Sequence, residues 1–312
     1  MTVIKSSLRT PAETAAGAKP SRPHPLSPGV RRIALSAAGI TLSCLLSEPE
    51  HTTPRATVIA VHGSGMSAGY FDGQAHPDLS LLTLGARLGF TVLSLDRPGY
   101  GHSATQLPDG QPLAEQSVTL HAALAEFAHR HEVGAGFFLL AHSFGGKVVL
   151  TAAADDVDAP LIGLDVSGCG HRYAVEPDRL PEPHSRAAWG FSWGAFGLYP
   201  PNTFLSSRSV VAPTPSWERR EVPTWPDVLP DVARRIRAPV RFTFAEHERW
   251  WRHDQQAVAE LSGMLTGSRV RVDRHPDAGH NISLGWAARS YHLRAFGFLE
   301  ECLARRGMTD SR

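Results

Sequence analysis

The sequence predicts an α/β fold, with a mostly parallel sheet of about eight strands flanked by helices and one inserted segment. Two observations lead to this prediction. Short apolar runs rich in Val, Ile and Leu alternate with stretches of helical periodicity, which is typical of parallel strands covered by helices on both faces. This alternation is interrupted between residues 171 and 230, where prolines and aromatic residues are frequent and the helix–strand rhythm is lost.

Each predicted element of the core corresponds to a short stretch of the sequence. After an N-terminal hairpin, strands are expected at residues 57–61, 90–95, 137–141, 161–166, 240–245 and 269–272. Helices are expected at residues 79–88, 113–131, 147–154 and 285–305. We therefore assign residues 1–29, rich in Pro, Ser and Ala, to a disordered leader, residues 30–170 and 231–308 to the core, and residues 171–230 to a cap.

The N-terminal part of the core is open to two interpretations. Residues 33–46 form an uncharged run that follows Arg31-Arg32, as in an export or lipoprotein signal with Cys44 as the acylation site. The same run also fits a β-hairpin with its turn at Ala38-Gly39. We favour the hairpin, and with it a cytoplasmic location, because the run is too short to span a bilayer and the sheet needs these strands.

The composition argues against several classes of partner. With 31 basic and 30 acidic residues the formal net charge is +1, which gives no strong field for nucleic acid or an anionic membrane. The three cysteines, Cys44, Cys169 and Cys302, are far apart and odd in number, so neither a disulfide framework nor a zinc site is expected. The 16 histidines are scattered without metal-ligand spacing, and no cofactor is expected. A small molecule is the expected partner, while the oligomeric state stays open.

Residues 139–146, Leu-Leu-Ala-His-Ser-Phe-Gly-Gly, are the most informative stretch of the chain. The apolar run 137–141 stops just before Ser143, and two glycines lead into a helical pattern. A serine on such a turn stands exposed at a helix N-terminus, where backbone N–H groups stabilise a developing negative charge. The stretch departs from the nucleophile elbow G-x-S-x-G at Ala141, so an ordinary strand–turn–helix with an incidental serine remains the alternative.

A serine nucleophile needs a base, and the base needs an orienting acid. His280 follows the last predicted strand and precedes the last predicted helix, which places it at the carboxyl edge of the sheet, where ligands collect in α/β folds. The acid is expected after the strand at 240–245. Glu248 is favoured over Glu246 because it lies further past the strand and can reach across, and Asp165 is a third possibility.

The oxyanion donors are expected to be backbone N–H groups. One is the N–H of Phe144, directly after the serine. The other is the N–H of Ser64, or else of Gly65, in the loop after the strand at 57–61, where glycines allow a ligand to approach the backbone.

The inserted segment 171–230 holds many of the aromatic residues of the chain. A connection of this length is often a lid, although its aromatic side chains could also pack among themselves as a small satellite core. We expect a cap that shapes an apolar substrate pocket above Ser143. The residues expected to line this pocket are His142, Trp189, Trp193 and Trp250.

Over residues 31–305 these motifs resemble those of the α/β-hydrolase superfamily, and the order serine, acid, histidine is also the order of that family. The matching positions are His62-Gly63, the loop Asp96-x-x-Gly99-x-Gly101-x-Ser103, Ser143, Glu248 and Gly279-His280. In the family the Asp96–Ser103 loop is structural. Two positions depart from the usual pattern, with Ala141 in place of glycine and Glu248 in place of aspartate.

The resemblance implies a serine hydrolase that cleaves an ester, thioester or lactone of a largely apolar small molecule, through a Ser-His-Glu triad and an acyl-enzyme. Epoxide hydrolases and dehalogenases of this fold use an aspartate nucleophile, which Ser143 argues against. Because one fold hosts many functions, two alternatives stay open. They are a lyase of a secondary-metabolite pathway that eliminates a carboxylate such as acetate, and a non-catalytic ligand-binding protein.

Overall fold

The computed structural model describes residues 24–155, 161–176, 179–181 and 185–310. Most of the predicted leader, residues 1–23, lies outside these ranges. The described end of the leader packs against the core. His24 Nε2 donates to the Asp72 carbonyl oxygen at 3.0 Å, and the Ser27 N–H donates to the Asp72 carboxylate at 3.1 Å.

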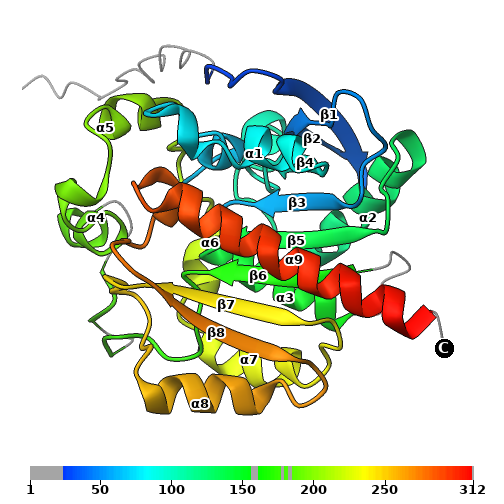
Figure 1. Cartoon of the computed structure of the whole chain (residues 1–312). Helices are drawn as coiled ribbons and strands as arrows, with labels where there is room; N and C mark the ends of the chain where they lie inside the picture. The colour runs from blue at the N-terminus through cyan, green and yellow to red at the C-terminus, as the bar shows by residue number, and fades with distance from the viewer. Residues whose placement is uncertain (1–23, 156–160, 177–178, 182–184, 311–312) are drawn as a thin grey trace, which may run out of the picture.

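A sheet of eight strands forms the centre of the molecule (Figure 1). The strands are β1 (Arg31–Ala37), β2 (Ile40–Ser47), β3 (Thr57–Val61), β4 (Thr91–Leu95), β5 (Phe137–His142), β6 (Leu161–Ser167), β7 (Val240–Ala245) and β8 (Val270–His275). Their order is β1-β2-β4-β3-β5-β6-β7-β8, with β3 to β8 mutually parallel and β1 and β2 antiparallel at one edge. The mostly parallel α/β fold predicted from the sequence is confirmed.

Helices cover both faces of this sheet. The α-helices of the described residues are α1 (Leu81–Arg87), α2 (Leu113–Arg130), α3 (Phe144–Ala154), α4 (Arg186–Ser192), α5 (Thr203–Ser206), α6 (Ser216–Glu221), α7 (Trp225–Ala233), α8 (Gln255–Met264) and α9 (Ala288–Asp310). Buried apolar residues of α1 and α9 belong to one large hydrophobic cluster, and buried apolar residues of α2, α3, α7 and α8 belong to another. In Figure 1, α9 crosses the sheet on the side nearer the viewer.

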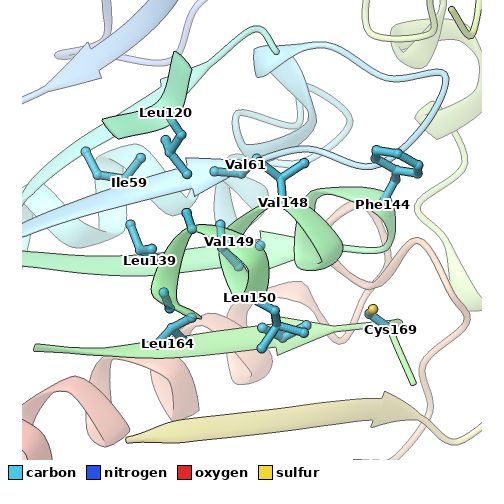
Figure 2. Packing of buried hydrophobic residues seen from close by; sticks show 14 of the residues in the cluster. Ile59, Val61, Leu120, Leu139, Phe144, Val148, Val149, Leu150, Leu164 and Cys169 are labelled. Carbon is cyan, nitrogen blue, oxygen red and sulfur yellow. The ribbon is translucent and has the colours of Figure 1, made fainter. Parts of the chain in front are cut away.

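Strand β3 shows why the central strands are apolar along their whole length. All of its residues are buried. Val58 and Ala60 pack in the cluster of α1 and α9, whereas Ile59 and Val61 pack in the cluster of α3, because successive side chains of a strand point to opposite faces. Figure 2 shows Ile59 and Val61 on the side of the sheet where Val148 of α3 lies.

The N-terminal hairpin is confirmed as β1 and β2. Its turn residues Ala38 and Gly39 have φ values of 49° and 80°, the positive values that a two-residue turn needs to match the twist of its strands. Cys44 lies inside β2, where it pairs with Ile33 of β1 and is 2% exposed. All three cysteines of the chain are free and buried.

Several elements differ from the prediction in their bounds or were not predicted. Helix α3 begins at Phe144 rather than at residue 147, so both glycines after Ser143 are helical. Strand β8 continues to His275, past the predicted end at residue 272. Helix α8 was not predicted, because it buries only Ala257 and Leu261 and therefore has little apolar periodicity.

The inserted segment ends earlier than predicted. Helix α7 packs against α3, and its residues Trp225 and Leu229 belong to the core cluster. Residues 225–230, which were assigned to the cap, therefore lie with the core. We call the described part of residues 171–224, which contains α4, α5 and α6, the cap segment.

Candidate active site

Ser143 occupies the turn between β5 and α3. Its φ of 53° and ψ of −118° are strained for a residue other than glycine, as in a nucleophile elbow. The Ser143 N–H donates to the Ser167 carbonyl oxygen at 2.8 Å, which ties the turn to the end of β6. Gly145 lets α3 start this close to β3, since a Cβ there would lie 2.3 Å from the Val61 carbonyl oxygen. Ala141, where the motif departs from glycine, is fully buried in β5.

The side chains of Ser143, His280 and Glu248 form one hydrogen-bonded chain. His280 Nε2 lies 3.1 Å from Ser143 Oγ, and His280 Nδ1 lies 2.8 Å from Glu248 Oε2. The second carboxylate oxygen of Glu248 accepts from the backbone N–H groups of Arg249 at 3.0 Å and Trp250 at 2.8 Å. Three residues that are far apart in the sequence thus meet at the carboxyl edge of the sheet.

The ionisation of Glu248 determines which nitrogen of His280 must carry a proton. Burial alone would raise the pKa of Glu248, but the charge and hydrogen bond of His280 and the Trp250 N–H outweigh burial and hold the pKa below its usual value. Glu248 is therefore ionised at neutral pH. Because a carboxylate only accepts, His280 Nδ1 carries a proton whether or not the ring is charged, and in the neutral ring Nε2 is the nitrogen that accepts from Ser143 Oγ.

The other two acids considered from the sequence lie elsewhere. Glu246 is on the surface, where its carboxylate accepts from the Asp277 N–H at 3.0 Å. Asp165 is buried inside β6, where Tyr291 OH donates to it at 2.9 Å and Arg241 Nε lies 2.5 Å from its carboxylate. The structure brings Glu248 to the histidine, and neither of these two.

Gly168 is a site residue that the sequence analysis missed. It follows β6 with a φ of +60°, and a Cβ there would lie 2.8 Å from His280 Cε1. The absence of a side chain therefore leaves room for the imidazole ring next to the serine. A signal was present in the sequence, because the run Ser167-Gly168-Cys169-Gly170 directly follows a buried strand.

Two backbone N–H groups of residues that line the same cavity as Ser143 have no hydrogen-bond partner among the described residues. Among the described residues, the N–H groups of Ser64 and Phe144 donate no hydrogen bond, and that of Phe144 opens α3. The Gly65 N–H, the alternative to that of Ser64, donates to Tyr100 OH at 3.0 Å. The N–H groups of Ser64 and Phe144 are therefore the two that remain able to donate to a ligand, and both residues line the cavity described below.

A buried carboxylate from the cap segment holds the loop that carries Ser64. Glu218 of α6 accepts from Ser64 Oγ at 2.6 Å, from Tyr100 OH at 3.0 Å and from the Arg97 guanidinium at 2.6 Å. Glu218 and Arg97 are both completely buried. Arg97 also donates to the His62 carbonyl oxygen at 2.8 Å, just before the loop. No local pattern marked Glu218, since its neighbours Glu221, Arg219 and Arg220 make α6 look like a solvated helix.

A cavity of about 510 Å³ lies above Ser143, within the size range of small-molecule sites. The four residues predicted for the substrate pocket, His142, Trp189, Trp193 and Trp250, are among those that line this cavity. His142 stacks on Tyr70 with ring centroids 4.7 Å apart, and burial keeps its pKa well below the usual value. It therefore faces the cavity as a neutral ring.

The aromatic side chains of the cap segment also pack with one another. The ring of Phe204 lies 5.0 to 5.8 Å, centroid to centroid, from those of Trp189, Trp193, Phe196 and Tyr199. The two interpretations of this segment are therefore compatible, because one cluster has its own contacts and also presents Trp189 and Trp193 to the cavity.

In the part of the chain that the structure describes, no group of three or more His, Cys, Asp or Glu residues is arranged to hold a metal ion. None of its helices combines the length and apolar character needed to cross a membrane.

Known proteins were compared with the chain. A model described as "Alpha/beta hydrolase family" matches residues 58–289. The structure is similar to that of a highly thermostable carboxyl esterase from Bacillus coagulans, with 15% identity, a TM-score of 0.65, and coverage of 88% of this chain and 99% of the esterase. It is also similar to an enol-lactonase from Burkholderia xenovorans LB400, with 16% identity, a TM-score of 0.63, and coverage of 86% and 100%.

A third similar structure is a membrane phospholipase A described as a bacterial virulence factor, with 16% identity, a TM-score of 0.63, and coverage of 88% of this chain and 87% of the phospholipase. No curated protein sequence matches the chain. The structural similarities, at these identities, show a shared fold. Because the family model extends from β3 to the start of α9, the protein belongs to the alpha/beta hydrolase family.

Proposed function

We propose that the protein is a serine hydrolase that cleaves an ester, thioester or lactone of a small, largely apolar molecule. The observation that carries this proposal is the hydrogen-bonded chain Ser143–His280–Glu248 on a strained elbow. The unpartnered N–H groups of Ser64 and Phe144 beside it support the same chemistry. The esterase, the lactonase and the phospholipase of the same fold act on bonds of this kind by their descriptions.

In the proposed mechanism, His280 Nε2 takes the Ser143 Oγ proton while Oγ attacks the carbonyl carbon of the substrate. The oxygen of the tetrahedral intermediate accepts from the N–H groups of Ser64 and Phe144. Glu248 stabilises the imidazolium, which then gives its proton to the departing alcohol or thiol. Water, deprotonated by the same histidine, attacks the acyl-enzyme and releases the carboxylic acid.

We also propose that the cap segment shapes the substrate pocket. The cavity has an apolar wall to which α4 contributes Trp189 and the adjoining turn contributes Trp193. Trp250 comes from a different part of the chain, the loop after β7. Its ring centroid lies 6.2 Å from that of His280. Such a cavity suits an acyl or alcohol group of moderate size with little polarity.

The proposal is tested with the purified protein, a fluorophosphonate probe and p-nitrophenyl butyrate. We expect the probe to label Ser143, and Ser143→Ala to abolish labelling and to lower kcat/KM by about 10³-fold or more. Ser262→Ala, at a serine of α8 whose hydroxyl donates to the Val258 carbonyl oxygen, is the matched control and should keep both the labelling and the activity. A wild-type protein that neither reacts with the probe nor cleaves short acyl esters would contradict the proposal.

An oxygen-isotope experiment separates hydrolysis from elimination. Hydrolysis in ¹⁸O-labelled water places one solvent oxygen in the released acid, because water attacks the acyl-enzyme. A lyase that used the same serine and histidine would release an alkene and a carboxylate without solvent oxygen. Tight ligand binding that survives Ser143→Ala and His280→Ala, with no turnover by the wild type, would instead indicate a ligand-binding protein.

A further inference from the structure

Lys147 is a buried cation beside the serine that the proposed mechanism does not use. It lies in the first turn of α3, four residues after Ser143, which caps the start of this helix. It is 3% exposed and lines the cavity. It is also the only lysine among the described residues, since Lys5 and Lys19 fall outside them.

Aromatic rings surround the ammonium group. Nζ lies 5.1 Å from the ring centroid of Phe144, 5.7 Å from that of Trp251, 5.8 Å from that of Trp225 and 5.9 Å from that of Tyr173. Contacts of this kind stabilise a cation but do not neutralise it. Three of these four residues, Phe144, Tyr173 and Trp251, also line the cavity.

No carboxylate of the described residues forms a salt bridge with Lys147. Its Nζ donates to Tyr173 OH at 3.3 Å and to the Val222 carbonyl oxygen at 3.4 Å, which leaves the third N–H free. The nearby carboxylates are engaged elsewhere: Glu218 pairs with Arg97, and Glu221 accepts from the Leu113 N–H. Burying a charge without a counter-ion costs free energy of folding. We therefore look for a function of this lysine.

Burial lowers the pKa of Lys147 to about 8. The side chain is therefore still mainly protonated at neutral pH. A second cation, Arg219 of α6, also lines the cavity. Its side chain is exposed, and its guanidinium donates to the Thr214 carbonyl oxygen. Among the described residues that line the cavity, none is Asp or Glu.

We propose that the cavity takes an ester whose acyl or alcohol part carries a carboxylate, with Lys147 as its buried counter-ion and Arg219 guiding it in. This inference rests on the proposed function and names its substrate class. A single ammonium with one free N–H suits a carboxylate, whereas phosphate sites gather several donors. The Cα atoms of Ser143 and Lys147 are one helical turn apart, about 6 Å along the axis, so several bonds separate the carboxylate from the scissile carbonyl.

The test compares monomethyl adipate with the neutral methyl hexanoate, followed by pH-stat at pH 7. We expect wild-type kcat/KM to favour the anionic ester by about tenfold or more. Lys147→Met should remove that preference through KM, and Lys147→Arg should restore part of it. The pair 4-acetoxybutyrate and butyl acetate repeats the comparison with the carboxylate on the alcohol side.

Neighbouring arginines provide a matched control. Arg219→Gln should lower the preference by about threefold, because its charge is exposed and screened. Arg220→Gln removes the same charge from the adjacent residue, which stacks on Trp217 and does not line the cavity, and it should leave the preference unchanged. Equal losses in these two variants would mean that net charge alone sets the preference, which overturns the role of Arg219.

Two readouts separate this inference from the proposed function. Labelling of Ser143 by the fluorophosphonate and turnover of neutral esters test the serine alone. If both are present but the wild type prefers the neutral ester in each pair, or if Lys147→Met keeps the anion preference, the carboxylate site is wrong and the hydrolase remains. If both are absent, the hydrolase proposal itself fails.

Binding without turnover provides the second readout, which also applies if a Lys147 variant fails to fold. Adipate should quench the fluorescence of the cavity tryptophans Trp250 and Trp251 in wild-type protein, and uncharged dimethyl adipate should quench it about tenfold more weakly. Equal quenching by the two compounds, or no response to adipate, overturns the carboxylate site.

Discussion

The two walls of the cavity are held in different ways. On the sheet edge, His280 and Glu248 are only 5% and 7% exposed and are joined to each other and to Ser143 by hydrogen bonds. In the cap segment, α4 buries none of its residues, and Trp189 is 39% exposed. Short polar bonds thus fix the groups proposed for the chemistry, whereas mainly apolar contacts hold the wall proposed to face the substrate.

Glu218 shows that the cap segment is not uniform. It belongs to α6, yet it is completely buried and bonded to the sheet-edge residues Ser64, Tyr100 and Arg97. Helix α6 is therefore anchored by a buried polar network, while α4 is held by ring contacts such as that between Trp189 and Phe196 and by two long hydrogen bonds, from the Asn281 N–H to Ser192 at 3.3 Å and from Arg249 to Gly190 at 3.4 Å. We expect substitutions at the sheet edge to change turnover, those in α4 to change KM, and those at Glu218 to change stability and turnover together.

The largest effect is expected for the acid on the sheet edge. Glu248→Gln should lower kcat/KM for p-nitrophenyl butyrate by about 10²- to 10⁴-fold, because the amide cannot hold the same histidine tautomer or stabilise the imidazolium. Glu246→Gln, two residues away on the surface, is the matched control and should change kcat/KM less than about twofold. Steady-state kinetics decide between them, and a larger loss in Glu246→Gln would make that residue the acid.

The second prediction concerns the anchored part of the cap segment. Glu218→Gln leaves the buried Arg97 guanidinium without its counter-ion, which should lower the free energy of unfolding by about 3–5 kcal/mol. It should also lower kcat by about tenfold, because the Ser64 N–H is no longer held in place. Urea denaturation and steady-state kinetics measure the two effects.

A surface carboxylate serves as the control for Glu218. Glu126 pairs with Arg130 one turn away on α2, and both side chains are partly exposed. Glu126→Gln should change the free energy of unfolding by less than about 0.5 kcal/mol. If Glu218→Gln were equally mild, the buried network would not anchor α6, and the cap segment would be held by apolar contacts throughout.

The third prediction uses the pH dependence of stability. The folded-state pKa of Lys147 is lowered to about 8 from 10.5, so between these pH values the unfolded chain keeps a proton that the folded chain releases. The free energy of unfolding therefore gains up to about 3 kcal/mol from this group as the pH rises through that window. Lys147→Met should be more stable than wild type at pH 7 by a similar amount and should lack this gain.

Urea denaturation of both proteins between pH 7 and about 10.5 measures this difference. Parallel stability curves for wild type and Lys147→Met would show that the buried ammonium imposes no cost on folding. A stabilised Lys147→Met variant that has lost the preference for a carboxylate would show instead that the buried charge of Lys147 destabilises the fold and serves binding.

The smallest effect is expected in α4. Trp189→Ala should raise KM several-fold with little change in kcat, and should lower the free energy of unfolding by less than about 1.5 kcal/mol, because the ring is partly exposed. Phe138→Ala, at a ring buried under α9, should cost about 3–5 kcal/mol instead. If Trp189→Ala changed kcat and left KM unchanged, the cap segment would position the reacting groups and the contrast between the two walls would not hold.

The sequence alone predicted what depends on local pattern. Apolar runs identified the central strands of the sheet, and the turn at Ala38-Gly39 identified the hairpin, because burial and backbone geometry there depend on neighbouring residues. Ser143 and His280 were predicted as site residues in the same way, because each lies in the stretch that follows a predicted strand. The choice of Glu248 over Glu246 came from reach along the chain, and the structure brings Glu248 to the histidine.

Tertiary structure alone decided which distant groups meet. Ser64 and Glu218 are 154 residues apart, and no local feature of α6 distinguishes a buried carboxylate from a solvated one. Lys147 likewise looks like any helical lysine until Tyr173, Trp225 and Trp251 from other parts of the fold surround it. Local pattern specifies elements and their buried faces, whereas the partner of a buried charge is specified by the packing of elements that the chain brings together from far apart.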